Sequence, residues 1–88
     1  MTETEIRQAI LDALHQIAPE ADLHQIRADE NLREALDIDS FDFLNVLISL
    51  HKRLGVEIPE ADYGQLTTLT ALVQYLSRRL AGASGRVS

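Results

Sequence analysis

The sequence predicts an all-α fold, a small four-helix bundle with three main helices and one short helix. Apolar residues recur at spacings of three and four over residues 3–17, 40–54 and 69–80, which is the pattern of helices with a buried face. No segment shows the alternation of apolar and polar residues that is typical of strands. We therefore expect one helical domain over residues 1–80 and a flexible tail over residues 81–88.

The composition is that of a folded domain: the 88 residues are 45% hydrophobic and 25% charged. There is no cysteine, which excludes disulfides, thiolate metal sites and a cysteine nucleophile. No apolar run is long enough to span a membrane, and the acidic N-terminus is unlike a signal peptide, so we expect a cytoplasmic location.

The formal charge of −6 is concentrated in one segment. Residues 29–42 contain six acidic residues and a single basic one, Arg33. Such a surface repels nucleic acid and attracts basic proteins, although acidic loops also serve simply to keep small proteins in solution.

The first helix is expected over residues 3–17. Thr2 and Glu5 have the spacing of a capping box, and Pro19 ends the helix near Ala18. Residues 18–39 then form a long loop with isolated apolar anchors, in which Asp29 could cap a short turn over residues 31–35. The anchors are Leu23, Ile26, Leu32, Leu36 and Ile38.

The central helix is expected over residues 40–54, and Gly55 ends it. Its large apolar residues cover an arc of roughly 220° at 100° per residue, so we expect burial over most of its circumference. Residues 56–59 are extended before Pro59, and Glu60–Gln65 form one short helical turn. Thr67 or Thr68 caps the last helix.

The sequence contains no cluster or motif of residues that is typical of a catalytic site. The histidines His15, His24 and His51 lie in separate elements without ligand spacing, and the four glycines are scattered rather than grouped in a phosphate-binding loop. Asp39 and Asp42 could form a carboxylate pair, but no neighbouring group would hold a substrate. The sequence therefore argues against an enzyme and against a metal site.

Ser40 is the remaining candidate, because it stands where the acidic segment meets the central helix. Serine and aspartate are both preferred helix caps, so on spacing alone a capping role for Asp39 or Ser40 is favoured over chemistry.

The segment from Leu32 to Leu76 resembles the acyl carrier protein family. The stretch Leu32–Asp42 matches the family's acidic loop and its D-S-L motif, with Phe41 in the usual leucine position. Glu57-Ile58-Pro59 and Thr67-Thr68-Leu69 are similar to two later segments of the family, at the same distance from the serine.

The resemblance implies that Ser40, beside Asp39, receives a 4′-phosphopantetheine arm from coenzyme A. A magnesium-dependent phosphopantetheinyl transferase adds the arm, whose thiol then carries an acyl group as a thioester. The implied partners are this transferase and the enzymes that load and transfer acyl groups, with no nucleic acid and no membrane insertion, and the chain is expected to be a monomer.

The sequence departs from typical fatty-acid carriers along the central helix. Asn45 and the run His51-Lys52-Arg53 replace glutamates, Asp37 replaces a glycine, and Phe43 replaces an exposed polar residue. These differences favour a specialised carrier with its own ligase or transferase. The recognition surface is then expected to combine acidic loop residues with an apolar patch: Asp37, Asp42, Phe41, Phe43, Asn45 and Ile48.

A hydrophobic acyl chain is expected beside the central helix and the short helix. The residues expected to line that space are Leu44, Leu47, Ile58, Tyr63 and Leu66, and plain core packing is an equal alternative for all five. Because Tyr63 stands where the family often has a small residue, the pocket would be short.

Three functions are therefore compared. The leading one is an acyl carrier in a fatty-acid, polyketide or other specialised acyl-transfer pathway. An aminoacyl or peptidyl carrier for a ligase-type system is a close alternative. The third, of a different class, is an inert helical adaptor whose acidic loop binds a basic protein.

Overall fold

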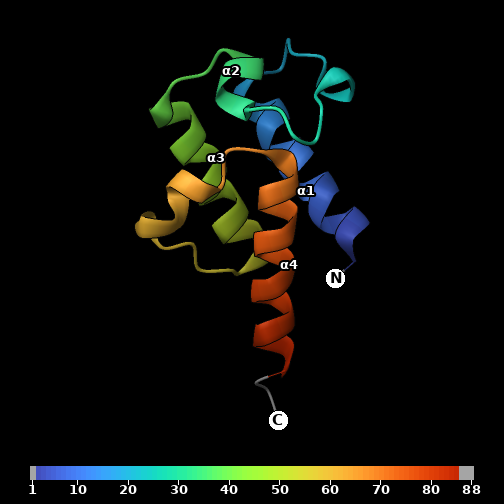
Figure 1. The fold of residues 1–88 in the computed structure, drawn as a ribbon, viewed down its shortest axis with the longest axis vertical. Coiled ribbons are helices and arrows are strands. Elements are labelled where there is room, and N and C mark those ends of the chain that lie inside the picture. Colours follow the sequence, from blue (N-terminus) through green and yellow to red (C-terminus); the bar gives the residue numbers. More distant parts are fainter. Residues whose placement is uncertain (1, 86–88) are drawn as a thin grey trace.

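The computed structural model describes residues 2–85, which contain four α-helices and two 3-10 helices joined by loops (Figure 1). In chain order they are α1 (Glu3–Ile17), η1 (Leu23–Gln25), α2 (Leu32–Leu36), α3 (Ser40–Leu54), η2 (Glu60–Gln65) and α4 (Leu69–Gly85). The predicted all-α class is confirmed, and no helix among the described residues is both long and apolar enough to cross a membrane.

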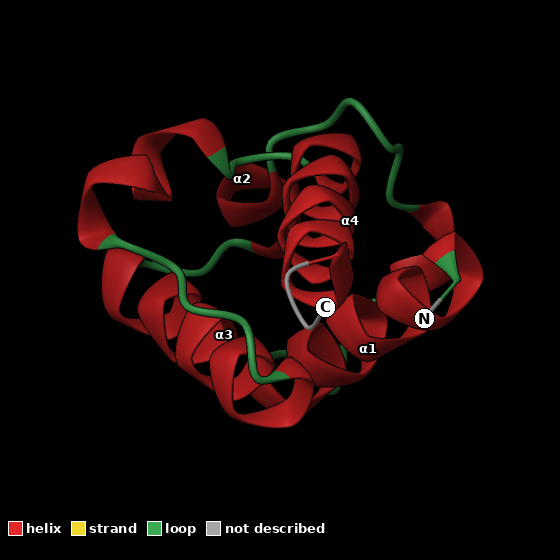
Figure 2. Ribbon diagram, turned by 90° about the horizontal axis from the view of Figure 1, so that it is seen from below, coloured by secondary structure: helices red, strands yellow, loops and turns green. Residues whose placement is uncertain are grey.

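The core lies where α1 packs against both α3 and α4, and Figure 2 shows this arrangement in a view along α4. Its buried residues are almost all aliphatic, as the low aromatic content requires. The largest fully buried side chains are Ile6, Ile10, Leu14, Leu32, Val46, Leu47, Leu50, Leu66, Leu72 and Leu76.

Local signals in the sequence set the helix ends. Thr2 and Glu5 form the predicted capping box, with the Glu5 amide donating to Thr2 Oγ1 at 3.2 Å. The Thr2 amide donates to Glu5 Oε1 at 3.2 Å, and this hydrogen bond, and then that from the Thr2 hydroxyl, lower the pKa of the Glu5 carboxyl. Gly55 closes α3 with φ +68°, a backbone angle that glycine adopts without strain. Thr68 caps α4, because its Oγ1 accepts from the Ala71 amide at 3.1 Å.

The expected loop over residues 18–39 contains more structure than the sequence indicated. Helix α2 forms within it and is capped by Asn31, not by Asp29. Two backbone hydrogen bonds fasten this segment to the start of α4: Leu32 N donates to Thr67 O at 2.8 Å, and Thr70 N donates to Ala28 O at 3.0 Å. The five predicted anchors all pack in or against the core. Tertiary contacts therefore stabilise a helix that is too short to be stable alone.

Asp37 ends α2 in the left-handed region, with φ +53°. This is the position at which the sequence resemblance calls for glycine, and the backbone angle gives the reason. Aspartate tolerates this region better than most residues with a side chain. The turn is therefore kept with aspartate, and it delivers the chain to the start of α3.

Helix α4 continues to Gly85, whereas the sequence analysis placed a flexible tail from residue 81 onward. Alanine is a strong helix former and Gly82 is followed by a further alanine, so the helical ladder continues past Leu80. Residues 86–88 of the expected tail lie outside the described residues.

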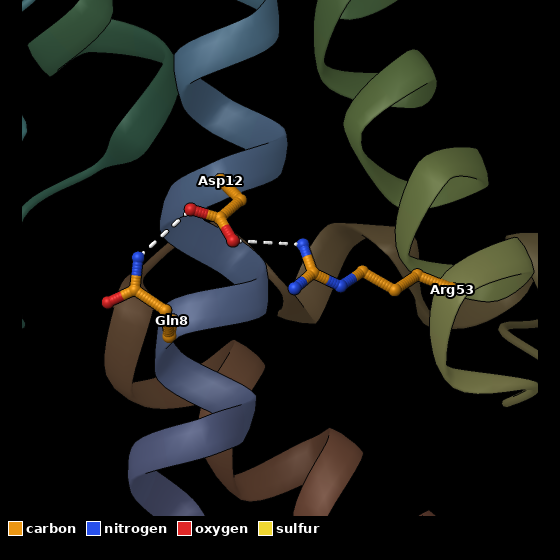
Figure 3. Close-up of polar contacts among 3 residues, drawn as sticks. All are labelled: Gln8, Asp12 and Arg53. Carbon is orange, nitrogen blue, oxygen red and sulfur yellow. Dashed lines mark hydrogen bonds and ion pairs between the residues drawn. The ribbon is translucent and has the colours of Figure 1, made fainter.

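One ion pair links the lower part of α3 to α1 (Figure 3). Arg53 Nη1 donates to Asp12 Oδ2 at 3.0 Å, and Gln8 Nε2 donates to Asp12 Oδ1 at 2.9 Å. The hydrogen bond from Gln8 and then that from Arg53 lower the pKa of the Asp12 carboxyl. The Arg53 guanidinium is thus engaged in an ion pair within the molecule.

Candidate functional site

Asp39 and Ser40 have different positions at the start of α3. Asp39 is the cap: its Oδ1 accepts a hydrogen bond from the Asp42 amide at 2.9 Å, and its own backbone is extended. Ser40 is the first residue of the helix and is exposed to solvent. No hydrogen bond within the described residues engages its hydroxyl. The cap is therefore Asp39, and Ser40 does not serve as one.

A phosphate ester fits the position of Ser40. The amides at the start of a helix have no acceptor within the helix, and Asp39 serves the amide of Asp42. The amides of Ser40 and Phe41 remain, and with the dipole of the fifteen-residue helix they favour a negatively charged group. The carboxylates of Asp37, Asp39 and Asp42 oppose this attraction, so their effect on a bound phosphate is repulsive.

A hollow beside Ser40 provides room for an attached group. It lies between α3 and η2, the yellow-orange turn next to α3 in Figure 1, and has a volume of about 330 Å³. Its walls are Ser40, Phe41, Leu44, Glu60 and Tyr63. Two of the five residues expected to line an acyl space, Leu44 and Tyr63, are found here together with Ser40. Glu60 was not foreseen, because nothing in its local sequence places it opposite the serine.

A second hollow of about 220 Å³ continues along the same side of α3. Among its walls are Leu47, Ile58 and again Tyr63, so four of the five expected acyl-lining residues border one hollow or the other. Leu66 borders neither and is buried in the core. The remaining walls are Ile48, His51 and Glu57.

The outer face of α3 carries a smaller apolar patch than the sequence predicted. Phe41 is 76% exposed and Ile48 is 39% exposed, with the exposed Asn45 between them. Phe43 is only 6% exposed and packs in the core, so its assignment to this surface was wrong. The exposure of Phe41, Asn45 and Ile48 also shows that α3 is not buried over most of its circumference, contrary to the expectation from the sequence.

The short helix η2 is fastened to α4 by a polar cluster that sequence reasoning did not find. Tyr75 donates its hydroxyl to Asp62 Oδ2 at 2.7 Å, and Arg79 Nη2 lies 3.4 Å from the same oxygen. The Arg79 guanidinium also lies 5.0 Å from the centre of the Tyr75 ring. Burial, and then the hydrogen bond to Asp62, raise the pKa of the Tyr75 hydroxyl.

His51 lies at the edge of the second hollow and has a structural partner. Its Nδ1 is 2.7 Å from Val56 O, beyond the end of α3. Within the described part of the chain, no group of three potential ligands is placed to hold a metal ion. His51 is thus a histidine at the edge of the hollow with a structural hydrogen bond.

Comparison with known proteins agrees with this geometry. Residues 4–76 match the family described as "Phosphopantetheine attachment site". The chain is 36% identical over 76 residues to the acyl carrier protein of Lactobacillus johnsonii, which covers 86% of this chain and 94% of that protein. It is 28% identical over 72 residues to the acyl carrier protein of Campylobacter hominis, covering 82% and 85% of the two chains.

A relative named for a polyketide synthase also matches. Polyketide-8 synthase acyl carrier protein 2 of Streptomyces avermitilis is 26% identical over 80 residues, which is 91% of this chain and 86% of that protein. Proteins of this family are carriers rather than catalysts, and a covalently attached 4′-phosphopantetheine is their prosthetic group. The chain belongs to the acyl carrier proteins, the family with a phosphopantetheine attachment site.

Proposed function

We propose that Ser40 is the residue that carries the 4′-phosphopantetheine arm. The observation that supports this most is the separation of roles at the start of α3. Asp39 caps the helix, whereas Ser40 is exposed beside unpaired amides and a hollow of about 330 Å³. The thiol of the attached arm supplies the thioester chemistry that the chain, which has no cysteine, lacks.

The loading step needs an external enzyme. The Ser40 hydroxyl oxygen attacks the phosphorus next to the pantetheine in coenzyme A, and its proton passes to a base of the transferase. The bond between the two phosphates of the diphosphate breaks, and 3′,5′-adenosine diphosphate leaves. The new phosphodiester sits at the start of α3, where unpaired amides and the helix dipole favour its charge.

Mass spectrometry of the intact protein tests this proposal. With coenzyme A, magnesium and a promiscuous phosphopantetheinyl transferase, the wild type should gain one arm and Ser40→Ala none. Ser49→Ala is the matched control, because Ser49 lies on the same helix away from its start, and it should gain one arm like the wild type. Modification of Ser40→Ala, or of none of the three proteins, would contradict the proposal.

The outer face of α3 is proposed as the surface that partner enzymes recognise. It is acidic at the start, where Asp37 and Asp42 lie, and carries Lys52 at the end, with Phe41 and Ile48 between. A matching partner is basic near its active-site mouth and neutral or acidic farther along. Charges of this kind steer association and are screened by salt, whereas the apolar patch supplies affinity that resists salt.

We further propose that the carrier serves a specialised pathway rather than general fatty-acid synthesis. Support comes from the polar and basic residues on α3 at positions where general carriers are acidic, Asn45 and Lys52. Whether the cargo is a fatty acyl, polyketide or aminoacyl group stays a prediction, as does the cytoplasmic location.

A further inference from the structure

The two hollows beside α3 meet at one side chain. Tyr63 borders both of them, and among the described residues the two share no other wall. The hollow that includes Ser40 is the first one, so an arm on Ser40 would reach it first. Because Tyr63 is the wall that the two hollows share, an acyl chain that passes from the first into the second would run past this residue.

We propose that Tyr63 divides the acyl-binding space and restricts this carrier to sheltering short acyl groups. The proposal rests on the attachment of the arm at Ser40. A short chain occupies the first hollow, against Leu44 and Phe41. A longer chain must either displace Tyr63 or turn out into solvent, because Tyr63 stands between the first hollow and the second, which Leu47 and Ile58 line.

The position of Tyr63 is fixed from both sides. Its ring is half-buried and packs against the core, and its carbonyl accepts a hydrogen bond from Leu66 N at 3.1 Å. The preceding residue, Asp62, is held to α4 through Tyr75 and Arg79. Asp62 is therefore a positioning residue: it does not border either hollow, but it keeps η2, and with it Tyr63, beside α3.

Thioester cleavage measures how well an acyl chain is sheltered. The protein is loaded with acyl-pantetheine from butyryl-, hexanoyl- or octanoyl-coenzyme A by a promiscuous transferase, and hydroxylamine cleavage is followed by intact mass. Each methylene that becomes buried should slow cleavage by up to about fourfold. In the wild type, we expect protection to level off, so that octanoyl is cleaved within about twofold of hexanoyl.

In Tyr63→Ala the two hollows should join, and octanoyl should then be cleaved about tenfold more slowly than in the wild type. Butyryl protection should stay within about twofold, because that chain needs only the first hollow. Asp62→Ala should move octanoyl protection in the same direction. Asp29→Ala is its matched control, since Asp29 also loses an ion pair, with Arg27, but borders neither hollow.

Protection that rises steadily to octanoyl in the wild type would overturn the proposal, and this result needs no variant to fold. Equal octanoyl protection in wild type and Tyr63→Ala would overturn it as well. Failure of the underlying attachment looks different, because the loaded mass would then be absent or would persist in Ser40→Ala. If Asp29→Ala changes octanoyl protection as much as Asp62→Ala does, Asp62 has no positioning role for Tyr63.

Discussion

The inner and outer faces of α3 are built from the same fifteen residues but differ in almost every property. Phe43 on the inner face is 6% exposed, and Phe41 on the outer face is 76% exposed. Two residues along a helix correspond to a rotation of about 200°, so neighbouring aromatic residues point in opposite directions. Apolar content alone therefore does not show which side of this helix is core and which is available to a partner.

The two faces also differ in how they are connected to the rest of the chain. The inner face contributes Val46, Leu47 and Leu50 to the core. The outer face presents Ser40, Phe41, Asn45 and Ile48, and no hydrogen bond or ion pair between described side chains engages them. Stability and the proposed recognition surface are thus separated around one helix, and substitutions should affect one without the other.

The largest expected effect contrasts the two phenylalanines. Phe43→Ala should lower the free energy of unfolding by about 3–5 kcal/mol, because it removes a buried ring from the core. Phe41→Ala should change it by less than about 0.5 kcal/mol but slow acyl transfer with the cognate partner. Urea unfolding gives the first quantity and transfer rates give the second. Equal destabilisation by both variants would break the distinction between the faces.

A smaller effect is expected at the first turn, where capping and chemistry are assigned to neighbours. Asp39→Ala should cost about 0.5–2 kcal/mol, because the Asp42 amide loses its acceptor. Ser40→Ala should stay within about 0.5 kcal/mol of the wild type while losing modification altogether. Thermal unfolding of both variants checks this, and a larger loss in Ser40→Ala than in Asp39→Ala would reverse the assignment.

The smallest effect concerns the two basic residues at the end of α3. Arg53→Gln should raise the pKa of Asp12 toward its ordinary value, whereas Lys52→Gln should leave it unchanged, because Lys52 forms no ion pair among the described residues. The Asp12 pKa remains somewhat low in Arg53→Gln, since the hydrogen bond from Gln8 is retained. NMR titration of the Asp12 carboxyl measures both shifts, and a response to Lys52→Gln would contradict this assignment.

The sign of the linked effect on stability follows from the direction of this shift. Asp12 has a lower pKa in the folded protein than in the unfolded chain, so the folded state favours the ionised carboxyl. Its contribution is fully present above the unfolded value of about 3.9 and is lost as the pH falls through the folded value. As the pH falls through that acidic range, the free energy of unfolding should therefore decrease less in Arg53→Gln than in the wild type.

The sequence was informative where local chemistry decides structure. The ends of α1 and α3 and the short helix η2 follow from Thr2, Gly55 and Pro59, which act on their immediate neighbours. Helix α2 was expected only as a short turn within a loop, because tertiary hydrogen bonds stabilise it, such as that from Leu32 N to Thr67 O. The choice between Asp39 and Ser40 as cap also needed the structure, because both residue types are suited to that position.

The exposed face of α3 and the polar cluster between η2 and α4 could not be predicted from the sequence, for a different reason. Phe41 and Phe43 both fall within the apolar arc, and only the packing of α3 against α1 and the core decides which one is buried. Tyr75 and Arg79 have the spacing of neighbours on one helix, but Asp62 lies on another element, so no local spacing indicates that it meets them. The resemblance pointed to Ser40 and to Tyr63, but only the arrangement of η2 shows that Tyr63 borders both hollows.

The pair of backbone hydrogen bonds between the loop segment and the start of α4 has a consequence for local opening. Leu32 N and Thr70 N donate in opposite directions across the same junction, so neither bond can break alone without distorting the other. The segment before α3 and the first turn of α4 should therefore open together as one cooperative unit. These two amides should exchange with solvent at similar rates, and far more slowly than loop amides elsewhere. The acidic segment leading to Ser40 is thus held as an ordered surface.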